Sequence, residues 1–269
     1  MSDEVAKIQI DEQMRLRLSA HRKPLEGVFN IIRFNWPSYA LALIVLAGFL
    51  VVCGMGGLPV RLFWIPLAVS CIFNWLLLSL IVSFIVYDAS DLYKFNWLLQ
   101  ELSERPLRIL NLHAGFDETS QGLHILFPKA ELTVFDFYSP TRSTEPSIAR
   151  ARAIRANGDS EAVSVDIAGW DLADCSQDLV HLFMAAHELR KAGDRELLFR
   201  EIDRVLKPGG DLVIVEHLRD VPNFIAFGPG FFHFYPRSEW LRLAETCGFV
   251  LRKERKIAVF VRVFYLCKK

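Results

Sequence analysis

A glycine turn with two carboxylates beside it is the first feature of this chain that could do chemistry. Residues 108–123 read RILNLHAGFDETSQGL, a buried strand followed by a turn that holds Gly115, Asp117 and Glu118. A strand, turn and helix in this order are typical of nucleotide-binding units, in which the turn approaches the ligand. A turn with one glycine is weak evidence by itself, so its neighbours decide what it binds.

Two aspartates follow the next predicted strands. Asp136 closes the strand in LTVFDF about twenty residues after Gly115, where an acid can accept both ribose hydroxyls. Asp166, in SVDIAGWDL, closes the third strand and can bond an adenine amino group. Each could instead be an ordinary turn aspartate. If both bind a ligand, the ligand contains adenosine.

The charge of the turn separates one adenosine ligand from another. A pyrophosphate needs bare backbone N–H groups at a helix N-terminus, and Asp117 and Glu118 would each repel it by about 1 kcal/mol or more. S-adenosylmethionine carries a sulfonium and an ammonium and no phosphate, so it fits better. The alternative is that both acids only stabilise the helix N-terminus, which still disfavours NAD.

Several side chains near the predicted cleft could hold or move a proton. Methyl transfer from a sulfonium needs mainly alignment, and a base is required only when the acceptor arrives protonated. His187 and Glu188 follow the fourth predicted strand, His217 follows the fifth, and His233 lies in FGPGFFHFYPRS. We predict His187 or His233 as the base and Tyr235 as a positioning donor. The alternative is that His187 and His217 are hydrogen-bonded structural residues.

These residues fall on alternating predicted strands and helices. Strands are predicted at about 108–112, 131–136 and 161–165 and in DLVHLFMA and DLVIVEHL, with helices between them and a closing strand pair at the end. The pattern predicts an α/β fold with a doubly wound, mostly parallel sheet over residues 107–269. Its ligand is expected at the carboxyl ends of the first strands.

Five motifs occur in a fixed order along this region. They are ILNLHAGFD, FDF, VDIAGWDL, DLVHLFMAAHELR and REIDRVLKPGGDLVIVEH. In this order they resemble the class I S-adenosylmethionine-dependent methyltransferase family of the small-molecule type. The first motif departs from the family pattern, with Asn111 in place of an acid and with His113 and Asp117 in place of glycines. YDASDLY, residues 87–93, is similar to a segment that folds over the cofactor in relatives.

The resemblance implies a Rossmann-like methyltransferase fold with a closing antiparallel strand pair, and S-adenosylmethionine as the cofactor. It also implies which residues contact the cofactor. On this basis we expect contacts from Tyr87, Asn111, His113, Ala114, Gly115, Asp117, Asp136, Phe137, Asp166, Ile167 and Phe183.

Two long uncharged runs precede this domain. Residues 38–58 and 62–87 contain no charged side chain, and each has the roughly twenty residues that a helix needs to cross a bilayer. They predict a transmembrane helical hairpin over residues 38–87, the alternatives being a buried helix pair or two arms in the membrane plane. The turn carries only Arg61, whereas the N-terminal flank carries Arg15, Arg17, His21, Arg22, Lys23 and Arg33. Both termini and the catalytic domain are therefore expected in the cytoplasm.

The other segments and the composition complete this organisation. Residues 1–37 are a charged N-terminal segment, and residues 88–106 are expected to form a linker or lid helix. The phenylalanine-rich loop 221–236 is expected to line an acceptor pocket or touch lipid, with core packing as the alternative.

The formal net charge is zero and no basic stripe is present, so no nucleic-acid partner is expected. Five scattered cysteines without CxxC spacing predict neither a disulfide framework nor a zinc site, and no metal ligand set is expected.

The sequence thus predicts a membrane-anchored methyltransferase whose partners are a small lipophilic acceptor and the lipid bilayer. A non-catalytic S-adenosylmethionine-binding sensor or scaffold is the second hypothesis, motivated by the altered glycine turn. A nicotinamide-dependent oxidoreductase is disfavoured by the acidic turn and by the lack of a suitably placed Tyr-x-x-x-Lys pair.

Overall fold

A mixed sheet is the centre of the domain. The computed structural model describes residues 12–54, 64–102, 104–142, 146–155 and 162–268. Within them the sheet has seven strands in the order β3-β2-β1-β4-β5-β7-β6. β7 runs antiparallel to both of its neighbours, β5 and β6, whereas the other neighbouring strands are parallel; this confirms the predicted α/β fold with its closing antiparallel pair. The strands are β1 (Arg108–His113), β2 (Glu131–Asp136), β3 (Val163–Ser164), β4 (Gln177–Phe183), β5 (Leu206–His217), β6 (Phe249–Ile257) and β7 (Val261–Lys268).

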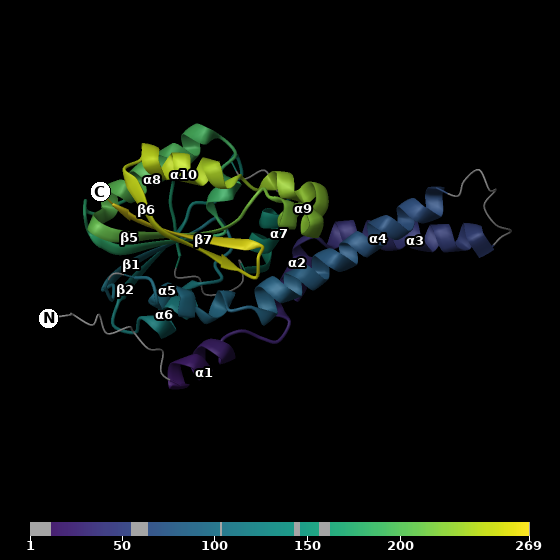
Figure 1. Cartoon of the computed structure of the whole chain (residues 1–269), viewed down its shortest axis with the longest axis horizontal. Helices are drawn as coiled ribbons and strands as arrows, with labels where there is room; N and C mark the ends of the chain where they lie inside the picture. Colours follow the sequence, from purple (N-terminus) through teal and green to yellow (C-terminus); the bar gives the residue numbers. More distant parts are fainter. Residues whose placement is uncertain (1–11, 55–63, 103, 143–145, 156–161, 269) are drawn as a thin grey trace.

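Helices cover both faces of this sheet (Figure 1). α8 (Ala192–Val205) and α10 (Arg237–Thr246) lie on one face, and α5 (Asn96–Leu99) and α6 (Ser120–Leu126) on the other. Side chains alternate along each strand, so one strand serves two cores. In β1, Leu110 and Leu112 pack into the core with α8 and α10, whereas Ile109 packs into the core with α6. Between β2 and β3 lies α7 (Pro146–Arg155).

The segment predicted as a linker helix over residues 88–106 is not a continuous helix. It holds a 3-10 turn, η3 (Leu92–Lys94), and the single turn α5, separated by Phe95 at φ +54°. Phe95 and Trp97 are fully buried, and the Trp97 indole N–H donates to the Leu92 carbonyl at 2.9 Å. Burial of these two aromatic rings overrides the local helix propensity, so the prediction of one helix was wrong.

A two-helix stalk projects from the domain (Figure 1). α3 (Trp36–Gly54) and α4 (Trp64–Ser83) run side by side, and α4 continues into the π-helical turn η2 (Phe84–Ala89). Among the described residues, the stretch Trp64–Lys94 is long and apolar enough to cross a membrane. A second span results only if α2 (Glu26–Phe34) and α3, which meet at 76°, are counted together. The transmembrane hairpin stays a prediction, and its turn lies outside the described residues.

The N-terminal segment is attached to the foot of the stalk. Asp88, in η2, accepts the backbone N–H groups of Gly27 at 2.9 Å and Val28 at 3.0 Å, and so caps α2. The preceding α1 (Glu12–Ala20) packs near α6 with Leu18 buried. Both helices therefore belong to the folded body, and α2 reaches the carboxyl edge of the sheet.

We predict that Gly122→Ala destabilises the domain, because helix α6 lies against Phe95 without room for a methyl group. A Cβ at Gly122 would lie 2.3 Å from Cε2 of the buried Phe95 ring. Such overpacking lowers the free energy of unfolding by about 1–3 kcal/mol. Chemical unfolding of the full chain in detergent micelles measures this change.

Gly193→Ala is the matched control. Gly193 lies in the first turn of α8, where an added Cβ meets nothing within 4 Å. We expect it to leave the stability unchanged or to raise it by up to about 1 kcal/mol. Equal unfolding midpoints for the two variants would contradict the packing argument.

Candidate functional site

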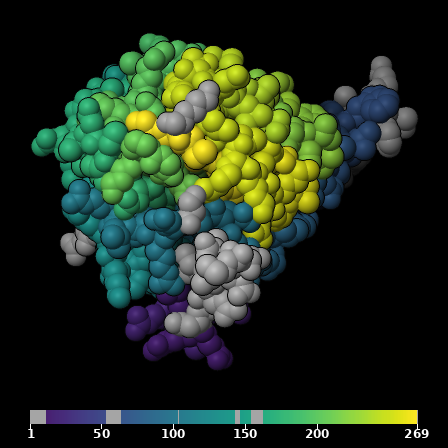
Figure 2. All heavy atoms as spheres, turned by 60° about the vertical axis from the view of Figure 1, so that its left-hand side comes forward, coloured from purple at the N-terminus to yellow at the C-terminus, as the bar shows by residue number. Residues whose placement is uncertain are grey.

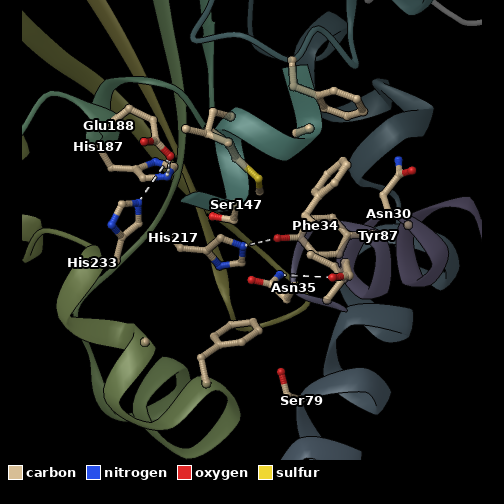
Figure 3. A pocket seen from close by; sticks show the side chains of 18 of the residues that line it. Asn30, Phe34, Asn35, Ser79, Tyr87, Ser147, His187, Glu188, His217 and His233 are labelled. Atoms are coloured by element: carbon tan, nitrogen blue, oxygen red, sulfur yellow. Dashed lines mark hydrogen bonds and ion pairs between the residues drawn. The ribbon is translucent and has the colours of Figure 1, made fainter. Parts of the chain in front are cut away.

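A cavity of about 490 Å³ lies where the sheet meets the stalk (Figure 3). Ala114 follows β1, Met184 follows β4 and His217 ends β5, so one wall consists of strand ends. Ser38 of α3 and Ser79 of α4 belong to the opposite wall. The cavity is therefore at the edge of the sheet where the sequence places a ligand, and the stalk closes it from the other side.

Three polar side chains converge on one wall of this cavity. His187 and Glu188 lie in the 3-10 turn η4 (Ala186–Glu188) directly after β4, and His233 ends η5 (Gly228–His233). Glu188 Oε1 lies 3.5 Å from His187 Nε2 and 3.3 Å from His233 Nε2. Figure 3 shows the two imidazoles and this carboxylate close together. The two predicted bases are neighbours in space although 46 positions separate them in the sequence.

Glu216 determines the charge of His187. The Glu216 side chain is fully buried, and its Oε2 lies 2.6 Å from His187 Nδ1. Burial disfavours a charged imidazole, but the carboxylates of Glu216 and Glu188 outweigh it and raise the pKa of His187 to about 10. Burial likewise opposes charge on Glu188, yet interactions with His187 and His233 lower the pKa of Glu188 to about 2. At neutral pH His187 can donate a proton but cannot accept one.

His217 has a structural role. Its Nδ1 lies 3.0 Å from the Phe260 carbonyl oxygen, which can only accept, so Nδ1 donates. Nε2 then accepts the hydrogen of the Tyr87 hydroxyl at 2.8 Å. Burial lowers the pKa of His217 to about 4, so its ring is neutral at physiological pH. The pair holds Tyr87 in the cavity wall, in agreement with the structural alternative stated for His217.

Asp117 of the glycine turn stabilises a helix. Its Oδ1 accepts the backbone N–H groups of Thr119 at 2.9 Å and Ser120 at 3.0 Å, at the start of α6. Burial opposes its charge, but these hydrogen bonds and the nearby His113 lower the pKa of Asp117. This is the helix-stabilising role that the sequence left open as an alternative.

Glu118, the second acid of the turn, lines the cavity but already has partners. It accepts the Tyr93 hydroxyl at 2.8 Å and lies 3.5 Å from the Arg22 guanidinium. Arg22 in turn stacks 3.5 Å above the Tyr93 ring. Only one of the two acids therefore faces the cavity, and a cation from the N-terminal segment partly neutralises it.

Asp136 uses both of its carboxylate oxygens within the protein. Oδ1 accepts the backbone N–H groups of Gly115 at 2.8 Å and Tyr138 at 2.9 Å, and Oδ2 accepts from Arg152. Gly115 has φ +91°, and a Cβ there would lie 3.1 Å from the Tyr138 ring, so this turn requires glycine. A ribose could reach the Asp136 carboxylate only by replacing Arg152.

Asp166 is held in a similar way, by Arg142 and by the backbone N–H of Ile167 at 2.6 Å. Arg142 opposes protonation of the carboxylate, and together with the Ile167 N–H it lowers the pKa of Asp166. Neither Asp136 nor Asp166 lines the cavity. In this conformation the two predicted adenosine-binding acids therefore point to arginines of the same chain.

The remaining predicted site residues divide between cavity and core. Tyr87, Ala114 and Phe183 line the cavity, as do His187 and His233. Buried elsewhere in the domain are Asn111, His113, Phe137 and Ile167. The Asn111 side chain in β1 is hydrogen-bonded to the side chains of Thr119, Ser120 and His181, and this holds the turn against the end of the strand.

Tyr235, the predicted positioning donor, lies outside the cavity wall. Its hydroxyl donates to the carbonyl groups of Leu189 and Arg190, at 3.3 Å and 3.2 Å. It supports the backbone after η4 and does not reach the cavity. A role in positioning the acceptor would have to act through that backbone.

Several cavity and support residues were not singled out from the sequence. Glu216 had a signal, because it precedes His217 at the end of a predicted strand. Arg22, Ser38 and Leu76 had none, because nothing in their local pattern shows that the stalk folds back onto the sheet edge.

Comparison with known proteins supports the chemistry suggested by the motifs. A family model described as a methyltransferase domain matches residues 128–214, which is less than half of the chain. The matched stretch runs from just before β2 into β5. This match supports a methyltransferase, and S-adenosylmethionine is the cofactor that it indicates. No curated protein matches the chain.

Solved structures with a similar sheet were also found. A SAM-dependent methyltransferase from Aquifex aeolicus is 17% identical, with 60% of this chain and 81% of that chain covered and a TM-score of 0.44. A SAM-dependent methyltransferase from Methanosarcina mazei is 15% identical, with 64% and 96% covered and a TM-score of 0.46. The PH0226 protein from Pyrococcus horikoshii is 16% identical, with 69% and 95% covered and a TM-score of 0.48.

We predict that Arg152→Ala strengthens binding of S-adenosylmethionine. The substitution removes the side chain that competes with the ribose for Asp136, so a larger fraction of the protein is competent to bind. Titration calorimetry should show a dissociation constant lower by about three- to tenfold. Arg200→Ala removes the same charge from the exposed face of α8 and should leave the affinity unchanged. Weaker binding by Arg152→Ala would show that Arg152 supports the cofactor and does not displace it.

Proposed function

We propose that this chain is a membrane-anchored, S-adenosylmethionine-dependent methyltransferase that acts on a small lipophilic acceptor at the cytoplasmic face of the membrane. The observation that carries the proposal is the composition of the cavity wall. Strand ends of a methyltransferase-like sheet form one side, and the apolar helices α3 and α4 form the other. An acceptor that partitions into lipid would reach the cavity along these helices.

The surface of the stalk supports insertion into a bilayer. Large apolar side chains are exposed along both helices, for example Ile44 at 68% and Trp64 at 71%. Only 17% of the most apolar stretch of Trp64–Lys94 is buried, which argues against a core helix. A helix of about twenty residues spans the roughly 30 Å of a hydrocarbon core. In Figure 2 the blue end of the stalk projects beyond the body of the domain.

The distribution of basic residues supports a cytoplasmic catalytic domain. The flank before the stalk carries Arg15, Arg17, Arg22, Lys23 and Arg33, and the turn of the proposed hairpin carries Arg61 alone. Short loops rich in Lys and Arg stay in the cytoplasm. Both ends of the hairpin, and with them the sheet, are proposed to lie on that side.

A second, apolar cavity supports a lipophilic acceptor. This crevice of about 280 Å³ lies between α3 and α4, and Leu41, Val45, Ile72 and Phe73 are part of its lining. It shares Ser38 and Leu76 with the larger cavity. An acceptor could therefore lie with its hydrocarbon chain between the helices and its polar head beside His187.

The phenylalanine-rich segment 221–236, which the sequence suggested was a loop, consists mainly of α9 (Val221–Phe227) and η5. It links the stalk to the edge of the sheet that carries the polar cluster. Phe227 and Phe234 line the larger cavity, whereas Phe224 and Phe232 are exposed at 43% and 59%. The Trp75 indole of α4 donates to the Ile225 carbonyl at 2.8 Å. The cavity-lining rings support the predicted acceptor pocket, and the exposed rings support the predicted contact with lipid.

The polar cluster supplies what methyl transfer requires of the protein. The methyl carbon is activated by the sulfonium, so alignment of the accepting atom removes most of the barrier. His187 is protonated at neutral pH, so it suits hydrogen bonding to a negatively charged acceptor atom. If the acceptor arrives protonated, His233 is the better-placed base of the two predicted histidines, with Glu188 3.3 Å from its Nε2.

One observation favours the second hypothesis, a non-catalytic sensor that binds S-adenosylmethionine. Asp136 and Asp166 are both paired with arginines, so the adenosine region is closed in this conformation. A sensor would use the displacement of Arg142 and Arg152 as its response. An enzyme would also need these two arginines to be displaced, and it would then transfer the methyl group to an acceptor.

The function is tested by incubating the purified full chain, in lipid nanodiscs, with methyl-labelled S-adenosylmethionine and a membrane-lipid extract. We expect saturable cofactor binding by calorimetry and label in the organic phase after extraction. Binding without transferred label would support the sensor. Absence of cofactor binding would contradict both.

The route of the acceptor is tested at Leu76, which contacts both cavities. Leu76→Trp should fill their junction and lower the rate of label transfer to the lipid fraction by about tenfold or more. Leu77→Trp places the same ring on the exposed side of α4 and should retain the rate. Cofactor affinity should be the same in both variants, and equal rates would exclude the proposed route.

A further inference from the structure

We propose that His187, Glu188 and His233 form a binding site for a divalent transition-metal ion in the wall of the larger cavity. One ligand atom from each residue can be chosen so that all three lie within 4.8 Å of one another. The residues come from two separate segments, η4 and η5, and their side chains point toward a common centre (Figure 3). The proposal concerns metal binding and does not depend on the reaction proposed above.

Two of the separations between the three ligand atoms match those in a metal site, and the two imidazole nitrogens lie within 4.8 Å of each other. Glu188 Oε1 lies 3.5 Å from His187 Nε2 and 3.3 Å from His233 Nε2. A tetrahedral ion with bonds of about 2.0–2.1 Å holds neighbouring ligand atoms about 3.3 Å apart. Direct hydrogen bonds between charged groups are shorter, about 2.7–2.9 Å. The same histidine makes one such short contact, at 2.6 Å, with Glu216.

Glu188 has an oxygen that only a further ligand would satisfy. The residue is 6% exposed, and its Oε2 has no hydrogen-bond partner among the described residues. A buried carboxylate oxygen without a partner is costly, because its hydration has been lost and nothing replaces it. A cation at the centre of the cluster would compensate the charge of both oxygens.

The hydrogen bond of the second ring nitrogen of His187 is of the kind that metal-binding histidines make. Nδ1 faces the fully buried Glu216, whose Oε1 also accepts the His187 backbone N–H at 3.3 Å. This contact keeps a proton on Nδ1 and turns Nε2 toward Glu188, so a metal ion would replace only the proton on Nε2. Metal-binding histidines almost always donate their other ring N–H to a carboxylate, a carbonyl or water in this manner.

Arg190 is a positive group beside the cluster. Its Nη1 donates to the His233 carbonyl at 2.7 Å and lies 3.3 Å from His233 Nδ1. The carbonyl is the nearer acceptor, so this contact does not require the lone pair of Nδ1. Metal binding would release the second proton of His187, and with this ring neutral the carboxylates of Glu188 and Glu216 exceed the single positive charge of Arg190.

The ligand set selects the class of metal. Two imidazoles and one carboxylate suit Zn²⁺ or Fe²⁺, whereas Mg²⁺ and Ca²⁺ prefer oxygen ligands throughout. Three protein ligands leave a coordination position open toward the cavity. That position could hold an oxygen or sulfur atom of the acceptor and lower its pKa, a role that rests on the proposed function.

Calorimetric titration of the metal-free full chain in detergent with ZnCl₂ tests the site. We expect one saturable site per chain, with Co²⁺ binding at the same stoichiometry and giving the d–d absorption of a site with nitrogen ligands. His233→Ala and Glu188→Gln should weaken Zn²⁺ binding by about 100-fold or more, and Glu216→Gln by about 10- to 100-fold. His124→Ala, on the exposed surface of α6, is the histidine control and should bind as the wild type does.

The outcomes separate this proposal from the proposed function. Absence of a saturable Zn²⁺ site, or unchanged binding by His233→Ala, overturns the metal site whatever the methyl-transfer assay shows. Unchanged chemical unfolding midpoints of the metal-free His233→Ala and Glu188→Gln chains demonstrate that the variants are folded and that the loss is local. A functional metal site in a chain without methyl transfer would uphold this inference and contradict the enzyme.

Discussion

The arrangement of side chains at the carboxyl edge of this sheet depends on one constraint: each buried carboxylate needs hydrogen-bond donors or a positive charge beside it. Removing a carboxylate from water is unfavourable by several kcal/mol unless fixed donors or cations replace the lost hydration. Asp117 is compensated by backbone N–H groups, Asp136 by backbone N–H groups and Arg152, and Glu216 by His187. Glu188 is compensated on one oxygen only. The pattern explains how the glycine turn is held, and the second oxygen of Glu188 is one of the observations from which a bound cation is proposed.

The stalk is joined to the edge of the sheet that carries the cavity. Asp88 in η2 caps α2, and the Trp75 indole of α4 donates to the Ile225 carbonyl of α9, which is followed by η5 and His233. Because α3 and α4 also line the cavity, a change in the position of the stalk would alter the acceptor side of the site directly. The proposed function would use this connection, because the acceptor and the anchor would then share the same lipid phase.

The cofactor side of the site shows how motifs and geometry differ. The motifs predicted acids at the ends of the first strands, and Asp117, Asp136 and Asp166 stand there in the structure. Their side chains, however, bind the helix start, Arg152 and Arg142. A motif specifies a residue type at a position on the sheet. It does not specify which of several possible partners, a ribose or an arginine from a later helix, the carboxylate has in a given conformation.

The sequence by itself determined the order of strands and helices along the chain, the presence of a closing strand pair, the apolar character of residues 38–87 and the five motifs, whose resemblance to a family implied that the closing pair is antiparallel. These are properties of local periodicity and of short segments, which the chain carries wherever it folds. Tertiary structure alone decided that Phe95 interrupts the linker, that the stalk forms a wall of the cavity, and that His187, Glu188 and His233 meet. Each depends on contacts between residues far apart in the chain, and packing and charge compensation select such contacts only when the whole sheet has assembled.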